Sequence, residues 1–134
     1  MSGTKIEDVC IEWAPFELRV GVTESDLLEA AEDLQNRFLD AQPGFVRREL
    51  LRGAERRWVD LIVWTNRADA DRAAARARES SACRNYFGLM ADVRGGVRYF
   101  SRAEHYGPAS LVAPDGLVGS DGPMTSDAGI ALAG

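Results

Sequence analysis

The stretch FVRRELLRGAERRWVDLIVWT, residues 45–65, decides the fold. Residues 45–52 and 57–65 are rich in β-branched, aromatic and leucine side chains, which favour strands. Between them, Gly53-Ala54-Glu55-Arg56 has the composition of a tight turn. The stretch therefore predicts a β-hairpin in the middle of the chain.

Helical patterns flank this hairpin on both sides. Before it, Thr23 and Asp26 have capping-box spacing, and apolar residues follow at helical intervals until Pro43-Gly44. After it, Asn66 or Asp69 can cap a helix that continues to Glu79. Ser80-Ser81 can then cap a short helical piece with an apolar stripe. That stripe comprises Cys83, Tyr86, Phe87 and Met90.

Two further strands are predicted at the ends of this region, over residues 9–19 and 97–106, with Pro15 marking an edge or a bulge in the first. The order of elements is then β-α-β-β-α-β. This is the ferredoxin-like arrangement of the α+β class.

Composition limits the function classes. The chain has 134 residues, 46% hydrophobic and 28% charged, which fits one globular domain over residues 1–106. Residues 107–134 hold six Gly, three Pro and no aromatic residue, and we interpret them as a tail.

The net charge is −5 and the basic residues are not concentrated on one face, so we expect no nucleic-acid partner. No apolar run has the length of a membrane span and no signal pattern precedes the domain, so we expect a cytoplasmic protein without a membrane partner.

The hairpin suggests a catalytic pair. With a turn centred near residues 54 and 55, Glu49 lies opposite Asp60 and Arg47 opposite Ile62, and these side chains share a face with Trp64. Two carboxylates at cross-strand distance repel, which raises one pKa and prepares a general base or acid. In the alternative interpretation, arginines (Arg47, Arg19 or Arg84) neutralise both carboxylates as buried ion pairs.

Other candidate residues are equally open to two interpretations. His105, the only histidine, is either a surface or dimer-contact residue or an acid/base of the pocket. Trp58 and Trp64 fit a core, and Trp64 can also stack on an aromatic substrate. Tyr86 is either a packing residue or a phenol aimed into the pocket. The cysteines, Cys10 and Cys83, match neither a metal-binding spacing nor a disulfide framework, and we expect no metal.

Four segments within roughly residues 8–106 carry a resemblance to a known family. They are Gln42-Pro43-Gly44-Phe45, Trp58 to Trp64, Asp69-Ala70 and Tyr86 to Met90. In these segments the chain resembles the dimeric α/β barrel superfamily, and within it the antibiotic biosynthesis monooxygenase-like group. The resemblance implies a homodimer. Its physical basis is that a sheet with helices on one face leaves the other face bare, and both faces of the strand at residues 58–64 are largely apolar.

The catalytic residues of that superfamily's known enzymes are matched in this chain to different extents. Haem-degrading relatives need an Asn where this chain has Ala14, and a Trp and a His that residues 69–90 lack. Plant-type polyketide cyclases place a His where Ser80-Ser81-Ala82 stands. The cofactor-free anthrone oxidases are more similar, since Trp64 and Arg84 match their pattern. Asp60 replaces their Asn, and Ala70 replaces a Tyr. Because an ionised carboxylate only accepts hydrogen bonds, this departure favours proton abstraction over oxygen insertion.

The sequence thus predicts a homodimeric enzyme of secondary metabolism that uses no metal or organic cofactor. We expect a hydrophobic, aromatic or polyketide-like substrate and either proton transfer (cyclase, isomerase or dehydratase) or cofactor-free oxidation. Asp60 is the expected base, assisted by Glu49 and His105. The expected substrate contacts are Trp64, Arg84, Tyr86, Arg47 and Trp58. The alternative is a non-catalytic dimer that binds a small ligand or stabilises a partner enzyme, with a small pocket and with both carboxylates held by arginines.

Overall fold

The computed structural model describes residues 9–92 and 96–109. The chain divides into two compact units, residues 1–104 and 105–134. Of the second unit only residues 105–109 are described, so most of the predicted tail lies outside the described residues.

The first unit is built on an antiparallel sheet of five strands. Its strand order is β2-β3-β1-β4, and β5 pairs with β1 as well. The strands are β1 (Cys10–Leu18), β2 (Phe45–Arg52), β3 (Arg57–Trp64), β4 (Met90–Asp92) and β5 (Arg98–Ser101). β4 and β5 pair with opposite ends of β1, so together they occupy one position in the sheet.

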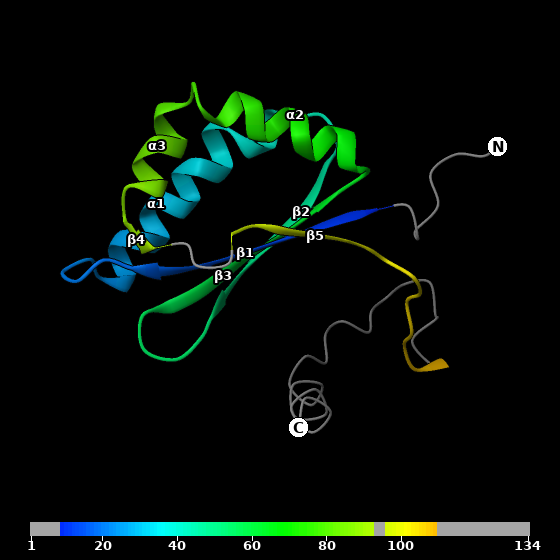
Figure 1. Ribbon diagram of the computed structural model, residues 1–134, viewed down its shortest axis with the longest axis horizontal. Coiled ribbons are helices and arrows are strands. Elements are labelled where there is room, and N and C mark those ends of the chain that lie inside the picture. The colour runs from blue at the N-terminus through cyan, green and yellow to red at the C-terminus, as the bar shows by residue number, and fades with distance from the viewer. Residues whose placement is uncertain (1–8, 93–95, 110–134) are drawn as a thin grey trace. The chain divides into compact units, whose positions relative to one another are not determined.

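The helices lie together on one side of this sheet (Figure 1). They are α1 (Glu24–Arg37), the 3-10 turn η2 (Leu39–Ala41), α2 (Arg67–Ala77) and α3 (Ser81–Phe87). A single layer of helices on one face of an antiparallel sheet confirms the predicted ferredoxin-like α+β fold.

Side-chain caps set where the helices begin. Thr23 and Asp26 form the predicted capping box, with both reciprocal hydrogen bonds at 3.0 Å. Asn66 caps α2 by accepting from the Asp69 amide at 2.8 Å, and Ser80 caps α3 by accepting from the Cys83 amide at 3.2 Å. These short polar side chains satisfy amides that have no partner within the helix.

The last part of the sheet differs from the prediction. The sequence predicted one strand over residues 97–106, whereas the structure has two short strands, β4 and β5. Met90, assigned to a helical stripe, lies in β4 instead. The reason is that α3 ends at Phe87 with Gly88 as its C-cap, so the chain enters the sheet three residues later.

Pro15 lies at the gap between the two short strands. β5 pairs with residues 10–13 of β1, β4 pairs with residues 17–18, and β3 pairs with the whole span on the other side. Among the described residues no strand pairs with residues 14–16 on the β4–β5 side. A proline, which has no N–H to donate, is tolerated at such a locally unpaired edge.

The two faces of the sheet have different surroundings. The core lies between the sheet and the helices and buries Leu27 and Leu34 of α1, Trp64 of β3 and Tyr86 of α3. The opposite face is also apolar but has no helix over it, and most of its side chains are only half-buried. It comprises Ile11, Trp13, Pro15, Leu51, Val59, Leu61, Val63 and Phe100.

Candidate functional site

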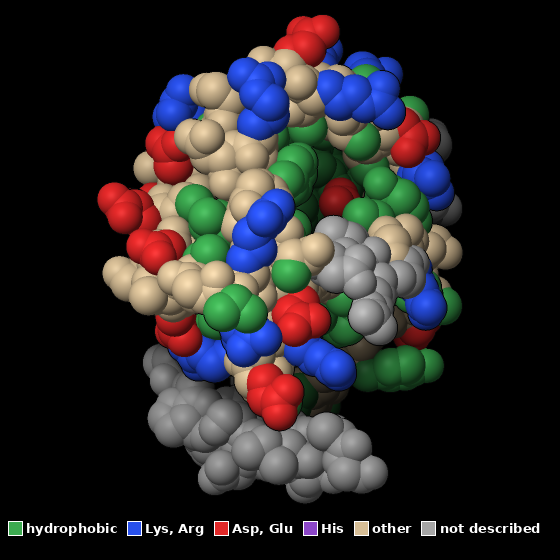
Figure 2. All heavy atoms as spheres, turned by 60° about the vertical axis from the view of Figure 1, so that its left-hand side comes forward, with side chains coloured by type: hydrophobic (Ala, Val, Ile, Leu, Met, Phe, Trp, Pro, Cys, Tyr) green, Lys and Arg blue, Asp and Glu red, His purple; other side chains and the backbone are tan. Residues whose placement is uncertain are grey.

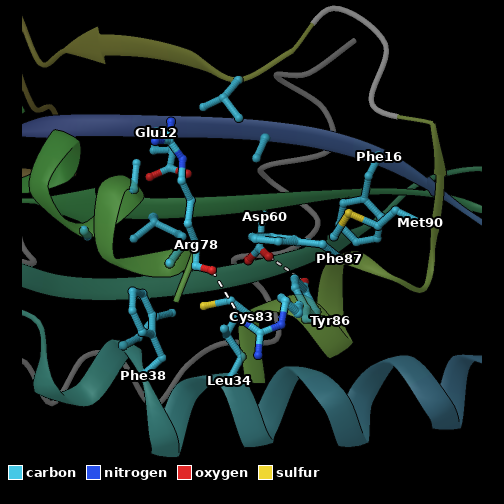
Figure 3. A pocket seen from close by; sticks show the side chains of 18 of the residues that line it. Glu12, Phe16, Leu34, Phe38, Asp60, Arg78, Cys83, Tyr86, Phe87 and Met90 are labelled. Carbon is cyan, nitrogen blue, oxygen red and sulfur yellow. Dashed lines mark hydrogen bonds between the residues drawn. The ribbon is translucent and has the colours of Figure 1, made fainter. Parts of the chain in front are cut away.

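A cavity of about 440 Å³ lies between the sheet and the helices. In Figure 2 it is a hollow with largely hydrophobic walls and an acidic side chain deep inside. The sheet contributes Glu12, Phe16 and Asp60 to its wall, and the helices contribute Leu34, Phe38, Cys83 and Tyr86 (Figure 3). A mainly apolar cavity with a few polar groups is typical of a small-molecule site.

Asp60 is buried in this cavity wall, and both of its carboxylate oxygens accept hydrogen bonds. Arg48 donates from Nε to Oδ1 at 2.7 Å and from Nη2 to Oδ2 at 3.1 Å, a bidentate pair whose side chains are each 7% exposed. The Tyr86 hydroxyl donates to Oδ2 at 2.5 Å. Asp60 is therefore neutralised by an arginine, as the ion-pair alternative expected, although the arginine is not one of those predicted.

Arg48 and Tyr86 are fixed by further contacts. Arg48 donates from Nη1 to the Ala31 carbonyl of α1 at 2.9 Å, and its guanidinium lies 5.3 Å from the Tyr86 ring centroid. Burial alone would lower the pKa of Arg48, but the hydrogen bond to Asp60, the negative charge of Asp60 and the contact with Tyr86 together outweigh burial and raise that pKa. Burial, reinforced by the negative charge of Asp60, raises the pKa of Tyr86. Both shifts keep the guanidinium of Arg48 charged and the phenol of Tyr86 neutral at neutral pH.

The predicted hairpin register is wrong by one residue. Leu50 lies opposite Asp60, and Arg48 lies opposite Ile62. The cause is the turn: the left-handed residue is Glu55, with φ 56°, and the loop has one residue more than a turn centred on residues 54 and 55. Because side chains alternate along a strand, a one-residue shift moves each one to the opposite face.

Glu49 and Arg47 are consequently not beside Asp60. They lie on the helix-free face, where Arg47 donates to Glu49 at 3.3 Å, and both side chains are about half exposed. Neither residue lines the cavity. The predicted pair of repelling carboxylates, Glu49 and Asp60, is not formed.

A different carboxylate does line the cavity. Glu12 of β1 is half-buried, and its Oε1 accepts a hydrogen bond from Trp64 Nε1 at 2.9 Å. Among the described residues no cation lies within ion-pair distance of it. Burial raises the pKa of Glu12, Asp60 adds to the rise, and the Trp64 N–H only partly opposes it. Glu12 is the carboxylate in this cavity that has no arginine of its own.

Three of the five predicted substrate contacts lie in the cavity wall. Trp64, Tyr86 and Arg84 line the cavity, with Arg84 exposed and donating to the Arg78 carbonyl at 3.3 Å. Trp58 is buried but is not part of the cavity wall. It lies towards the hairpin turn, where the Arg52 guanidinium is 5.3 Å from its ring centroid.

Several other predictions remain open. His105 follows β5 in the second compact unit and is exposed there, so its proposed catalytic role stays a prediction. Within residues 9–92 and 96–109, no three His, Cys, Asp or Glu side chains are grouped as metal ligands. In the same residues, no helix combines the length and apolar character that crossing a membrane requires.

Comparisons with known proteins identify the fold. No family model and no curated protein matches the sequence. Among solved structures, SnoaB, a cofactor-independent oxygenase from Streptomyces nogalater, aligns with a TM-score of 0.62 and 20% identity over 75% of this chain and 99% of that one. A proposed antibiotic biosynthesis monooxygenase from Caulobacter crescentus aligns with a TM-score of 0.59 and 14% identity over 74% and 93%. One from Nitrosomonas europaea aligns with a TM-score of 0.55 and 16% identity over 75% and 96%.

The chain has the fold of the antibiotic biosynthesis monooxygenases. This confirms the structural resemblance predicted from the sequence, and at these identities it concerns the fold alone. The chemistry of the site therefore depends on the residues that line it in this chain.

Sequence reasoning missed Arg48 and Glu12. The predicted register put Arg47 opposite Ile62, the position that Arg48 occupies in the structure, so Arg48 was not considered. Glu12 had a usable signal, because Cys10, Ala14 and Phe16 share its parity on β1 and all are apolar. A single carboxylate on an otherwise apolar strand face indicates either a buried pair or a functional group.

Proposed function

We propose that this protein is a cofactor-independent enzyme that binds a flat, hydrophobic, aromatic or polyketide-like small molecule between its sheet and its helices. The observation that carries this proposal is the 440 Å³ cavity, which is lined mostly by apolar and aromatic side chains. Its volume lies in the range of about 300–1,000 Å³ that is usual for small-molecule sites. Exposed arginines in the lining, Arg78 and Arg84, suit a substrate with a polar or anionic edge.

Proton transfer is the chemistry that we assign first. The cavity holds carboxyl and phenol groups among mainly apolar side chains, which suits the movement of a proton on a bound carbon acid. Cofactor-free oxidation is the second candidate, and the similarity in fold to a cofactor-independent oxygenase favours it. An enzyme of that kind takes dioxygen as its second substrate, and the ionised substrate itself supplies the electrons.

A non-catalytic binding protein is the competing proposal. The neutralised Asp60 fits it, since the pair with Arg48 stabilises a fold without any need for chemistry. The size of the cavity fits it less well, because that proposal expected a small pocket. Glu12, which has no arginine partner of its own, also favours a catalytic function over a non-catalytic one.

Binding and turnover of anthrone, a flat aryl ketone, test this proposal. Quenching of tryptophan fluorescence should report binding because Trp64 forms part of the cavity wall. In Ala77→Phe the new ring would fill the cavity, and we expect affinity to fall about tenfold or more, equal to about 1.4 kcal/mol. The matched control is Ala75→Phe on the same helix, where the side chain is exposed and lies outside the cavity.

Turnover separates the three possibilities. Anaerobic proton exchange into the bound anthrone supports proton transfer, and consumption of oxygen in air supports oxidation. Binding without either reaction supports the non-catalytic alternative. Lack of saturable binding by the unmodified protein contradicts the proposed function as a whole.

We also propose that the protein is a homodimer through the helix-free face of its sheet. That face exposes half-buried apolar side chains from three strands, including Trp13, Leu61 and Phe100. A stable interface of standard size would bury about 1,600 Å² in total. Light scattering should therefore give twice the mass of the chain at micromolar concentration, and a folded monomer under those conditions would contradict the proposal.

A further inference from the structure

Glu12 differs from the other charged groups of the cavity in what its oxygen atoms contact. Oε1 is held by Trp64 Nε1 at 2.9 Å, whereas Oε2 has no hydrogen-bond partner among the described residues. Every fully buried side-chain oxygen or nitrogen in those residues has a hydrogen-bond partner. Because Oε2 has none, it is not fully buried. A carboxylate that is oriented by one oxygen and open at the other has the arrangement that a general base needs.

The groups around Glu12 leave its charge without a dedicated counterion. On the neighbouring strands it lies opposite Ile62 of β3 and Tyr99 of β5. The nearby arginines are engaged elsewhere: Arg48 is paired with Asp60. Arg67 is paired with Asp71 and stacks 3.8 Å above the Tyr99 ring centroid. The remaining titratable neighbour on β1 is the Cys10 thiol, whose pKa burial raises.

We propose that Glu12 is the general base of this site and that its substrate is an aryl ketone whose acidic C–H group is conjugated with the carbonyl, as it is through the rings of anthrone. Oε2 takes the proton, the C–H bond breaks, and its electron pair moves into the carbonyl to give an enolate. The protonated Glu12 then returns the proton at another position of the same molecule. The net reaction is an isomerisation in which nothing is oxidised or reduced. This proposal rests on the proposed function, since it requires that such a molecule occupies the cavity.

Asp60 is a poorer candidate for this step. Both of its oxygens already accept hydrogen bonds, from Arg48 and from Tyr86, and its side chain is only 7% exposed. A proton taken by Asp60 would have to displace one of these donors. Glu12 needs no such displacement, because Oε2 is open.

The raised pKa of Glu12 is consistent with this role. A free glutamate with a pKa of 4.5 is a weak base at neutral pH, and burial moves the Glu12 pKa upwards towards the working range. The Trp64 N–H and the positive charge of Arg48 limit the rise. The exchange rate should therefore increase with pH through a midpoint above 4.5.

The test follows exchange of the acidic protons of anthrone in deuterated buffer under nitrogen, by mass spectrometry, with the uncatalysed rate subtracted. We expect Glu12→Gln to bind anthrone with unchanged affinity and to lose about 10²- to 10⁴-fold in exchange rate. Glutamine keeps the size of the side chain and an oxygen that can accept from Trp64. Glu12→Asp, which retains a carboxylate at shorter reach, should recover part of the rate.

The matched control is Glu17→Gln on the same strand. Glu17 lies on the other face of the sheet, outside the cavity, and its Oε2 is 3.6 Å from Arg56. This variant should exchange at the rate of the unmodified protein. Thermal melts and circular dichroism confirm that each variant is folded before rates are compared.

The outcomes distinguish this inference from the proposed function. If anthrone binds and Glu12→Gln exchanges as fast as the unmodified protein, Glu12 is not the base and the proposed function stands. Saturable binding with no catalysed exchange in the unmodified protein also overturns the role of Glu12. If anthrone does not bind at all, the proposed function fails, and the role of Glu12 fails with it.

Discussion

The cavity holds two carboxylates whose surroundings are opposite. Asp60 on β3 is opposite Ala14, and Glu12 is two residues before Ala14 on β1, so both side chains are on the same face of the sheet. Asp60 is held by the guanidinium of Arg48 and the hydroxyl of Tyr86. Glu12 receives one neutral N–H, from Trp64.

This difference shows that a charged group in an apolar cavity can either stabilise the fold or be available for catalysis, depending on its partners. A buried carboxylate with a bidentate arginine is fixed, because removing either partner leaves the other charge in a medium of low dielectric. A half-buried carboxylate with one neutral donor keeps an open oxygen and a raised pKa.

The largest effect is expected at Asp60. Asp60→Asn leaves Arg48 buried without its anion, and we expect the free energy of unfolding to fall by about 3–5 kcal/mol. Denaturant titration measures this loss. The double variant Arg48→Met/Asp60→Leu removes both charges and should regain most of the stability, because an apolar replacement of a buried pair is often neutral. A loss below 1 kcal/mol in Asp60→Asn would show that the pair does not stabilise the fold.

Trp64→Phe should have an intermediate effect at the other carboxylate. Phenylalanine keeps the aromatic packing against Phe45 but cannot donate to Glu12. We expect a loss of about 1.5–3 kcal/mol, the usual range for a hydrogen bond to a charged group. The pKa of Glu12 should rise further, because the donor that stabilised its ionised form has gone.

Carbon-13 NMR of labelled glutamate carboxyls measures that second change. Trp13→Phe is the control, since Trp13 lies on the helix-free face of the same sheet. If both variants titrate Glu12 at the same pH as the unmodified protein, the Trp64 hydrogen bond has no electrostatic role.

A smaller effect concerns the pH dependence of stability. Because the Glu12 pKa is raised in the folded state, the folded protein binds more protons than the unfolded chain just above pH 4.5, and stability falls as pH rises through this range. Glu12→Gln lacks this titration. Its stability relative to the unmodified protein should therefore increase from about pH 4 to about pH 7, as measured by thermal melts. A difference that stays constant over that range would contradict a raised pKa.

Much of the fold could be predicted because local signals determined it. Thr23, Asn66 and Ser80 marked the helix starts through capping chemistry that acts within three residues. The apolar pattern of residues 58–64 placed β3 in the sheet. The division of the last strand into β4 and β5 could not be predicted in this way, because it depends on where α3 ends and on pairing with distant residues of β1.

The site was predicted less well, because it depends on a register that one turn residue decides. Trp64, Tyr86 and Arg84 do line the cavity. Strand parity indicated Trp64, the family resemblance indicated Arg84, and the sequence left Tyr86 open between packing and the pocket. Arg48, the partner of Asp60, was not predicted, because the hairpin register depends on Glu55. This residue adopts the left-handed conformation, which is unusual for a residue other than glycine. Tertiary proximity, and not spacing, brings Glu12 and Trp64 together across 52 residues.

The smallest effect is expected at Glu49, and it tests the register directly. In the structure Glu49 forms an exposed ion pair with Arg47, and such pairs contribute only about 0–1 kcal/mol. Glu49→Gln should thus change the free energy of unfolding by less than about 1 kcal/mol. The register predicted from the sequence requires a different result, because there Glu49 would face Asp60 in an apolar pocket and its neutralisation would relieve repulsion. A clear gain in stability at neutral pH, absent below pH 4, would therefore support the predicted register over the observed one.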